Sequence, residues 1–471
     1  MKMTNAMYQR TMAAAAATLL CACADVSQKP YQRPDMPAKG AWSSQKDLPV
    51  APARIIEQDW WKQFRDPYLD GLVDRALGQN LDLKILAART GVAKAQIEEA
   101  RAGALPTMDA GAGASFEKST GQKFSKTFNL GTQVNWDIDI WGKVAKGVEA
   151  QTSEFRASEA DWRAGYLTLV SDVSTTYFQI LQFDEQIRQQ EEALAKNKQI
   201  LATYDAMLQN GLVPETRVLQ QRAEINRMSK DLIELARLRA LAGNALATLL
   251  GVPAGEFKVP PGSLRQRVSL PEVPEGLPSD LLKRRPDIVA AEYRVLVAYD
   301  LVGQAKLAQL PSVSMTGHGG TASFALSSLM KSFTFGLLPS INFPIFDPGV
   351  KARIKTSEAQ TEVAEQTYRR TVIGAFEEVE NALVNLDAHR RQRTELQEQA
   401  QRLSLVAAQV QAQLKEGIVT QLEVFESERS LLAAQLALLA IHQQILADTV
   451  TLYKALGGGW PPVDVRNAGR N

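Results

Sequence analysis

Cysteine and histidine are scarce in this sequence. The chain has 2 cysteines among 471 residues, Cys21 and Cys23, and both lie near the N-terminus. Its 3 histidines, His318, His389 and His442, are widely separated and have no cysteine nearby. The body of the chain therefore has no disulfide and no cysteine or paired-histidine metal site. GxSxG, GxxxxGK and HExxH motifs are also missing, so the sequence predicts neither an enzyme nor a cofactor or metal site.

An excess of charge of one sign is missing as well. The chain has 53 Lys and Arg against 52 Asp and Glu, and no block of like charge. Proteins that bind nucleic acid need a basic patch, so this class is excluded. With 45% hydrophobic and 22% charged residues, disorder of the whole chain is excluded too. After the N-terminal segment we find no uncharged apolar run of about 18 residues, which predicts that no helix spans a membrane.

The N-terminal segment has the features of an export signal. Residues 1–22 carry two basic residues and then a short apolar run, which is typical of a secretory signal peptide. The run ends in Leu20-Cys21-Ala22-Cys23, which resembles a bacterial lipobox, the motif that precedes a lipidated cysteine. We predict lipidation at Cys23, because the bulky Leu20 directly before Cys21 does not suit signal peptidase. The alternative is an ordinary cleavage site that happens to contain cysteines.

The rest of the chain repeats itself at an offset of about 206 residues. The matching residues are Asp82, Val92, Ala93, Ala100 and Leu105-Pro106 with Asp287, Val297, Ala298, Ala305 and Leu310-Pro311; Asn135, Ile138 and Gly142 with Asn342, Ile345 and Gly349; and Gly211 and Val213 with Gly417 and Val419. We therefore divide the chain into a signal peptide (1–22), a lipidated, proline-rich tether (23–56), a first repeat (57–260), a proline-rich linker (261–278), a second repeat (279–460) and a C-terminal tail (461–471).

Each repeat is predicted to contain a helix, two strands, a very long helix, a turn and another helix. The first repeat has an expected helix over Pro67–Ala104, strands over about 107–117 and 127–140, and helices within 143–250. The counterparts are strands over about 312–323 and 331–346 and helices within 350–456. Apolar residues at 166, 170, 173, 177 and 180 alternate steps of four and three, which is typical of a coiled coil.

The second strand of each repeat alternates apolar and small polar residues. The apolar sets are Phe128, Leu130, Val134, Trp136 and Ile138, and Phe333, Phe335, Leu337, Ile341 and Phe343. This alternation is typical of membrane β-barrels, although a soluble two-sheet sandwich alternates in the same way. Four strands are too few to close a barrel, and an open edge in lipid leaves backbone groups unsatisfied. We expect three copies to share twelve strands, because eight strands from two copies leave no open lumen.

Several local motifs make the chain resemble the TolC family of outer-membrane efflux ducts, in its OprM- and NodT-like lipoprotein branch. These motifs are the lipobox, Lys29-Pro30-Tyr31, Arg33-Pro34, Trp60-Trp61 with Asp66-Pro67, Ala87-Ala88-Arg89 and Arg285-Pro286-Asp287-Ile288. The resemblance implies a mainly helical fold with membrane strands. It implies a homotrimer in which a twelve-stranded barrel in outer-membrane lipid continues into a periplasmic α-barrel of coiled-coil helices. It also implies two partners, a periplasmic adaptor protein and an inner-membrane RND-type pump.

The same resemblance suggests which residues carry the function. An apolar ring and acidic rings at the periplasmic aperture fall on Leu422, Glu423 and Glu426. The alternative for Glu426 is a local pair with Arg429 on an exposed helix face. The two helix-turn tips are expected to bind the adaptor; they comprise Gly211, Leu212 and Val213, and Gly417, Ile418 and Val419. Positions that are Tyr and Arg in one branch of the family are Leu414 and Val419 here.

The predicted function is a passive outer-membrane duct of a tripartite efflux system, which exports drugs or other small toxic compounds. The predicted location is the cell outer membrane, with a lipid anchor and an extension into the periplasm. Two alternatives remain at this point: a duct for type I protein secretion, and a structural periplasmic coiled-coil lipoprotein without a pore. An outer-membrane enzyme is disfavoured by the missing nucleophile motifs. The exported compound cannot be read from the sequence.

Overall fold

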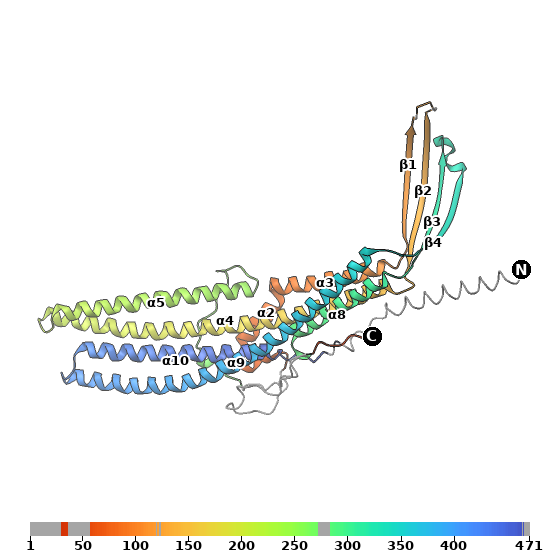
Figure 1. Ribbon diagram of the computed structural model, residues 1–471. Coiled ribbons are helices and arrows are strands. Elements are labelled where there is room, and N and C mark those ends of the chain that lie inside the picture. Colours follow the sequence, from red (N-terminus) through yellow and green to blue (C-terminus); the bar gives the residue numbers. More distant parts are fainter. Residues whose placement is uncertain are drawn as a thin grey trace.

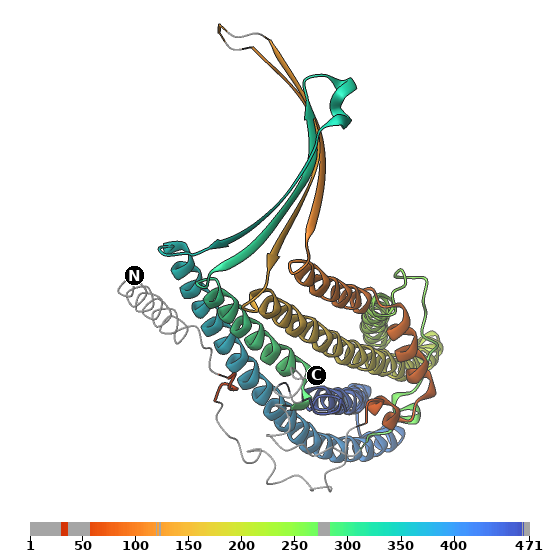
Figure 2. The same ribbon diagram turned by 90° about the vertical axis from the view of Figure 1, so that its right-hand side faces the viewer.

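The computed structural model describes residues 30–35, 57–118, 120–121, 124–271, 283–463 and 465. The predicted signal peptide and Cys23 lie outside these ranges. The described chain is elongated, with a four-stranded sheet at one end and two helical hairpins at the other (Figure 1). Seen from the end that carries the sheet, the strands rise above the ends of the helices (Figure 2).

Both halves of the described chain contain a helix, two strands, a very long helix and a 35-residue helix in the same order, which confirms the predicted repeat. The first half has η2 (Trp60–Phe64), α2 (Pro67–Gln79), α3 (Leu81–Ala102), β1 (Thr107–Glu117), β2 (Ser125–Ile138), α4 (Lys143–Gln209) and α5 (Glu215–Leu249). The short α6 (Leu264–Arg267) follows, and then α8 (Pro286–Leu307), β3 (Ser312–Ser323), η3 (Leu326–Lys331), β4 (Phe333–Asn342), α9 (Pro348–Lys415) and α10 (Gln421–Ala455). Helices α5 and α10 both have 35 residues and are offset by 206 residues at each end.

The helix expected over Pro67–Ala104 is divided at Asn80, which is a correction to the sequence prediction. The Asn80 side chain accepts a hydrogen bond of 2.8 Å from the Leu83 N–H and so caps α3. It also donates to the Leu249 carbonyl at 2.9 Å, which ties the break to the end of α5. The cap interrupts an apolar pattern that had favoured one continuous helix.

Two strand boundaries also differ from those expected. Strand β2 begins at Ser125 and ends at Ile138, before the expected residue 140, because a turn precedes the left-handed Gly142 at the start of α4. Strand β4 covers only Phe333–Asn342, because the 3-10 helix η3, which was not predicted, includes Lys331. Strands β1 and β3 have the expected bounds.

The predicted coiled-coil seam is buried. In α4 the side chains of Val170, Val173, Tyr177 and Ile180 are fully buried, and in α9 those of Val372, Val379 and Leu386 are too. The core around them includes η2, in which Trp60 stacks on Tyr453 of α10 with ring centroids 5.1 Å apart. The N-terminal part of the first repeat therefore packs on the helical bundle.

Helix α10 is the one described helix that is long enough and apolar enough to span a membrane by length and composition, a test that buried core helices also pass. However, it packs along α9 and α4, and its Leu439, Ile445 and Leu446 are fully buried in the core. Its apolar residues therefore serve packing within the helical bundle.

Candidate channel wall and periplasmic tips

The four strands form one antiparallel sheet in the order β1-β2-β3-β4. Residues directly opposite each other in an antiparallel pair point to the same face. Val134 pairs with Gly317, which in turn pairs with Leu337, so the apolar sets of β2 and β4 lie on one face. This apolar face comprises Phe128, Leu130, Val134, Trp136, Ile138, Val313, Met315, Phe333, Phe335, Leu337 and Ile341. Two runs 200 residues apart in sequence thus make one continuous surface.

The opposite face of the sheet is mostly polar. It comprises Asp109, Asn129, Gln133, Asn135, Ser314, Thr316, His318, Thr334 and Ser340, with Leu338 as an apolar exception. Its side chains bond both along β2 and across strands. Asn135 Oδ1 accepts from Gln133 at 2.9 Å and from Thr316 at 3.3 Å, and the hydroxyls of Ser314 and Ser340 are 2.7 Å apart. This polar face suits contact with water in a lumen, and the apolar face suits lipid.

Aromatic side chains mark both ends of the sheet. Near the helices, the Trp136 indole donates to the Ala104 carbonyl at 2.9 Å, and the Trp141 indole donates to the Pro311 carbonyl at 2.7 Å. At the far end, the Phe116 ring lies 6.2 Å from Phe128 and 6.4 Å from Phe124. Phe128 and Trp136 are eight residues apart on β2, or about 26 Å along the strand. Aromatic bands at this separation match the two interfaces of a membrane.

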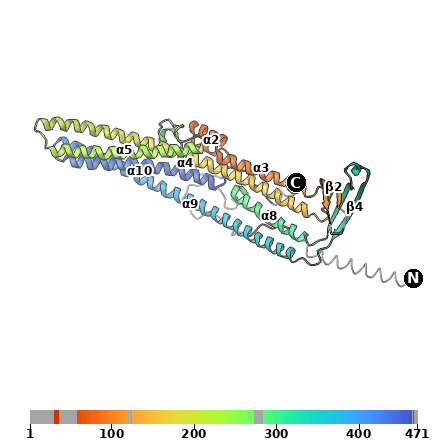
Figure 3. The ribbon, with the colours of Figure 1, turned by 90° about the horizontal axis from the view of Figure 1, so that it is seen from above.

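The hairpin ends lie together at the opposite end of the molecule from the sheet (Figure 3). Both turns have the same geometry. Gly211 and Gly417 adopt positive φ angles of 68° and 71°, which favour glycine. The following Leu212 and Ile418 are exposed, whereas Val213 is buried. The structure thus presents two equivalent exposed apolar side chains at the tips, in the segments predicted to bind the adaptor.

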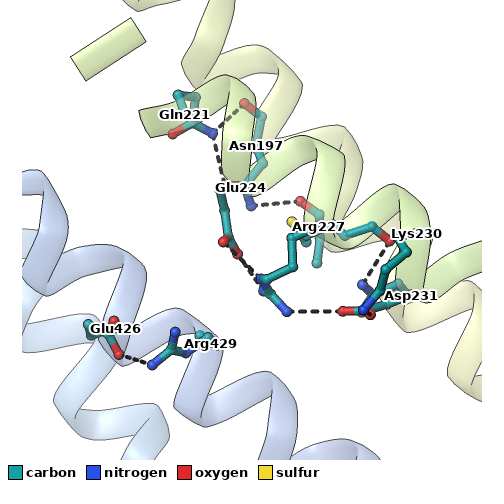
Figure 4. A network of polar contacts seen from close by, with 11 residues as sticks. Asn197, Gln221, Glu224, Arg227, Lys230, Asp231, Glu426 and Arg429 are labelled. Atoms are coloured by element: carbon teal, nitrogen blue, oxygen red, sulfur yellow. Dashed lines mark hydrogen bonds and ion pairs between the residues drawn. The ribbon is translucent and has the colours of Figure 1, made fainter. Parts of the chain in front are cut away.

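The predicted aperture residues lie at the start of α10. Leu422 is exposed, and the carboxylate of Glu423 forms a capping box with Thr420. Glu426 forms an ion pair with Arg429, which is the local pair considered from the sequence. Figure 4 shows this pair on α10 opposite the Arg227 network on α5.

Arg227 of α5 forms ion pairs within its own helix and also interacts at longer range with a carboxylate of the other hairpin. It binds Glu224 at 2.9 Å through Nε and Asp231 at 3.0 Å through Nη1, both on α5. The hydrogen bonds with Glu224, together with the charges of Asp231 and Glu426, raise the pKa of Arg227. Glu426 belongs to the other hairpin, so the carboxylate proposed for the aperture lies within the field of a cation on the first repeat.

The sequence prediction missed two ion pairs that join distant segments, each with one buried partner, Arg285 in the first and Glu292 in the second. Arg285, seen only as part of a family motif, lies at the start of α8 and is 2.7 Å from Glu378 of α9. It also donates to the Ala455 carbonyl at the end of α10, at 3.1 Å. Arg33 of the tether binds the buried Glu292 of α8. In each case the two charges are distant in sequence, so no local spacing could have revealed the pair.

An amphipathic four-stranded sheet joined to two long helical hairpins defines a subunit of a membrane channel with a large extension outside the bilayer. The sequence profile of the family described as "Outer membrane efflux protein" matches residues 72–252 and 277–458. The chain belongs to this family of outer-membrane channels, which confirms the resemblance seen in the sequence, and it is the outer-membrane component of a tripartite efflux system.

Known relatives cover nearly the whole chain. The pyoverdine export outer membrane protein OpmQ of Pseudomonas putida is 31% identical over 86% of this chain and 89% of its own length. The cation efflux system protein CusC of Escherichia coli is 31% identical over 91% of this chain and 95% of its own length. The open state of the MtrE outer membrane channel of Neisseria gonorrhoeae superposes with a TM-score of 0.82 at 29% identity, covering 92% and 98% of the two chains.

Proposed function

We propose that three copies of this chain form a passive duct that carries small toxic compounds from the periplasm to the exterior, without catalysis. The observation that supports this most strongly is the amphipathic sheet with two unpaired outer strands, β1 and β4, among the described residues. Such edges are unfavourable in lipid unless other strands pair with them. Three copies supply twelve strands, which enclose an aqueous lumen lined by the polar face.

The long helices give the duct its reach into the periplasm. Helices α4 and α9 have 67 and 68 residues, so each extends about 100 Å at 1.5 Å per residue. In the proposed trimer six hairpins surround one passage. Leu422, Glu423 and Glu426 then line its periplasmic end, where Leu422 narrows the opening and the carboxylates favour cations over anions.

The tips and the N-terminus connect this duct to its surroundings. Exposed Leu212 and Ile418 suit an apolar contact with a periplasmic adaptor, which couples the duct to an inner-membrane pump of the RND type. Lipidation at Cys23 adds an anchor in the inner leaflet of the outer membrane. The relatives OpmQ and CusC are named for the export of pyoverdine and the efflux of cations, so related ducts serve different compounds. We infer that the pump, rather than this duct, selects the cargo.

The decisive test combines assembly and conductance. Native mass spectrometry of the protein purified in detergent should give three copies per particle, and the same sample should open stable channels in a planar bilayer. A stable monomer, or a trimer that does not conduct even when the aperture residues are substituted, contradicts the duct. The second result would favour a structural lipoprotein without a pore.

A further inference from the structure

The turn between β3 and β4 is an ordered element. Helix η3 (Leu326–Lys331) is held to β3 by side-chain hydroxyls. Thr321 donates to the Leu329 carbonyl, and the hydroxyls of Ser323 and Ser328 are 2.5 Å apart. Ser328 also donates its backbone N–H to the Ala325 carbonyl at 3.1 Å. These bonds fix the position of η3 at the ends of β3 and β4 that lie away from the helices, while the β1–β2 hairpin extends further (Figure 2).

The register assigns η3 to the apolar face. Thr321 pairs with Leu130 on one side and Phe333 on the other, so its side chain points to the apolar face. Ser323 pairs with Phe128 and points the same way. Because both hydroxyls bind η3, this helix folds over the apolar side of the sheet and contacts both β2 and β3. It lies over the face proposed to contact lipid, away from the polar face proposed to line the lumen.

The outward surface of this segment is strongly apolar. The exposed fractions of Phe324, Leu326, Met330 and Phe333 are 78%, 67%, 80% and 74%. Exposed apolar groups of this size grouped in one short segment mark an interaction surface. They continue the apolar face directly, since Phe333 is the first residue of β4 and Phe335 follows on the same side.

Two cations accompany these apolar groups. Lys331 is exposed at the end of η3. Lys126 of β2 pairs with Phe116, lies two residues before Phe128 on the apolar face, and has its Nζ 5.8 Å from the centre of the Phe124 ring. Apolar and aromatic groups followed by lysines form the arrangement that fits a lipid surface with anionic headgroups.

We propose that η3, with Phe324, Leu326, Met330 and Lys331, is an anchor that binds lipid of the outer leaflet whose phosphates give it a net negative charge. Phe324, Leu326 and Met330 enter the acyl chains next to the barrel, and Lys331 and Lys126 bind the headgroup phosphates. The proposal rests on the proposed function, because it needs the apolar face of the sheet to lie in lipid.

Site-directed spin labelling tests this placement. The body of the chain has no native cysteine, so single substitutions Met330→Cys, Phe335→Cys and Thr334→Cys each introduce one labelling site there. The parent protein, treated identically, reports any label at Cys23. The full-length protein in vesicles that contain a phosphate-bearing outer-leaflet lipid is then exposed to oxygen, which concentrates in lipid, and to a nickel chelate, which stays in water.

The expected result is high oxygen and low nickel accessibility at positions 330 and 335, and the reverse at 334. If 335 is in lipid and 330 is in water, η3 is free to meet an external macromolecule, and the anchor is overturned while the barrel stands. If 335 is in water, the membrane sheet itself is wrong, and the proposed function fails first.

The lipid chemistry is tested separately. The parent and a Lys126→Gln/Lys331→Gln variant are compared by native mass spectrometry after incubation with a bis-phosphorylated lipid or with neutral phosphatidylcholine. The parent should retain more of the phosphorylated lipid than of the neutral lipid, and the variant should lose this preference while remaining a trimer. Equal retention by the parent and the variant contradicts the role of the two lysines.

Discussion

Arg33 of the N-terminal segment binds Glu292 of α8 in a bidentate pair, with Nε–Oε1 and Nη2–Oε2 distances of 2.7 Å and 2.5 Å. The Glu292 side chain has no exposed surface. Beside the pair, Tyr31 packs on the cluster formed by Ile288, Ala291, Val295, Tyr368, Val372 and Ala375, with its ring centroid 5.9 Å from that of Tyr299. The segment therefore inserts alternate side chains between α8 and α9, and Pro34 is buried as well.

This contact limits where the proposed lipid anchor can lie. Tyr31 is eight residues after Cys23, so the connecting chain spans at most about 28 Å. If Cys23 carries the proposed lipid, the bound segment sets a maximum distance between the membrane surface and the helices α8 and α9.

We predict that Arg33→Ala destabilises the protein strongly, because it removes a bidentate cation from the fully buried Glu292 carboxylate. Loss of one partner of a buried pair costs about 3–5 kcal/mol. Thermal unfolding in detergent measures the effect, with the exposed neighbour Gln32→Ala as the control. Adding Glu292→Gln to Arg33→Ala should recover part of the loss. No recovery in this double-mutant cycle would mean that the pair is not what holds the segment.

The two faces of β4 should tolerate a charge very differently. Phe335→Arg puts a cation on the apolar face, at a cost of roughly 2–4 kcal/mol if the residue lies near the middle of the bilayer. Thr334→Arg puts the same cation on the polar face, where water solvates it. The yield of trimer in isolated outer membranes measures both variants. Equal yields would contradict the assignment of the two faces to lipid and water.

The carboxylates at the start of α10 should control ion selectivity. We predict that Glu423→Gln/Glu426→Gln lowers the preference for cations or raises conductance, because it removes six negative charges from the aperture of a trimer. Glutamine still satisfies the capping box, so assembly should remain normal. Glu398→Gln, which removes a similar local pair with Arg402, is the control. Unchanged selectivity and conductance in planar bilayers would mean that both glutamates only lie on an exposed helix face and have no role in the aperture.

The folded state should become more stable as the pH falls, because protonation of Asp300 removes a buried negative charge. Burial raises the pKa of Asp300 to about 6, although the Lys146 ammonium, 3.3 Å away, opposes this shift. Since the pKa is higher in the folded state, folding binds the proton, and stability falls as pH rises through 6. The free energy of unfolding should increase by at most about 3 kcal/mol between pH 7 and pH 4.

Thermal unfolding at several pH values measures this dependence. Asp300→Asn should flatten the profile between pH 5 and pH 7, because the amide does not titrate. Asp161→Asn, which removes the more exposed ion pair with Arg294 between the same helices, should leave the slope unchanged. A slope that survives in the Asp300 variant would assign the dependence to another group.

Lipidation is expected at Cys23. Mass spectrometry of the mature N-terminus should find a triacylated cysteine followed by Ala24, and Cys23→Ser should remove the lipid. Cys21→Ala is the control that should leave it in place. A mature N-terminus at another residue, or an unmodified Cys23, would contradict the prediction.

Local patterns in the sequence were enough to determine the order of the elements. The period of two in residues 128–138 and 333–343, and steps of four and three in the long helices, depend only on neighbouring residues. They therefore predicted the strands and the coiled-coil seam, and the offset of 206 residues predicted two equivalent halves. The break at Asn80 was missed although its cap on the Leu83 N–H is a local signal, and its second hydrogen bond, to Leu249 169 residues away, cannot be predicted from local spacing.

Tertiary structure alone decided which distant residues meet. The register of β2 with β3 unites the two apolar sets on one face and assigns η3 to the same side. The packing of the helices likewise brings together Arg33 and Glu292, which are 259 residues apart, and places Glu426 close enough to Arg227 for the two charges to interact. The spacing of residues in a sequence determines only which neighbouring side chains share a face. Contacts between distant residues depend on the way in which the long helices and the strands pack against one another. The partner of a buried charge is therefore known only from the folded structure.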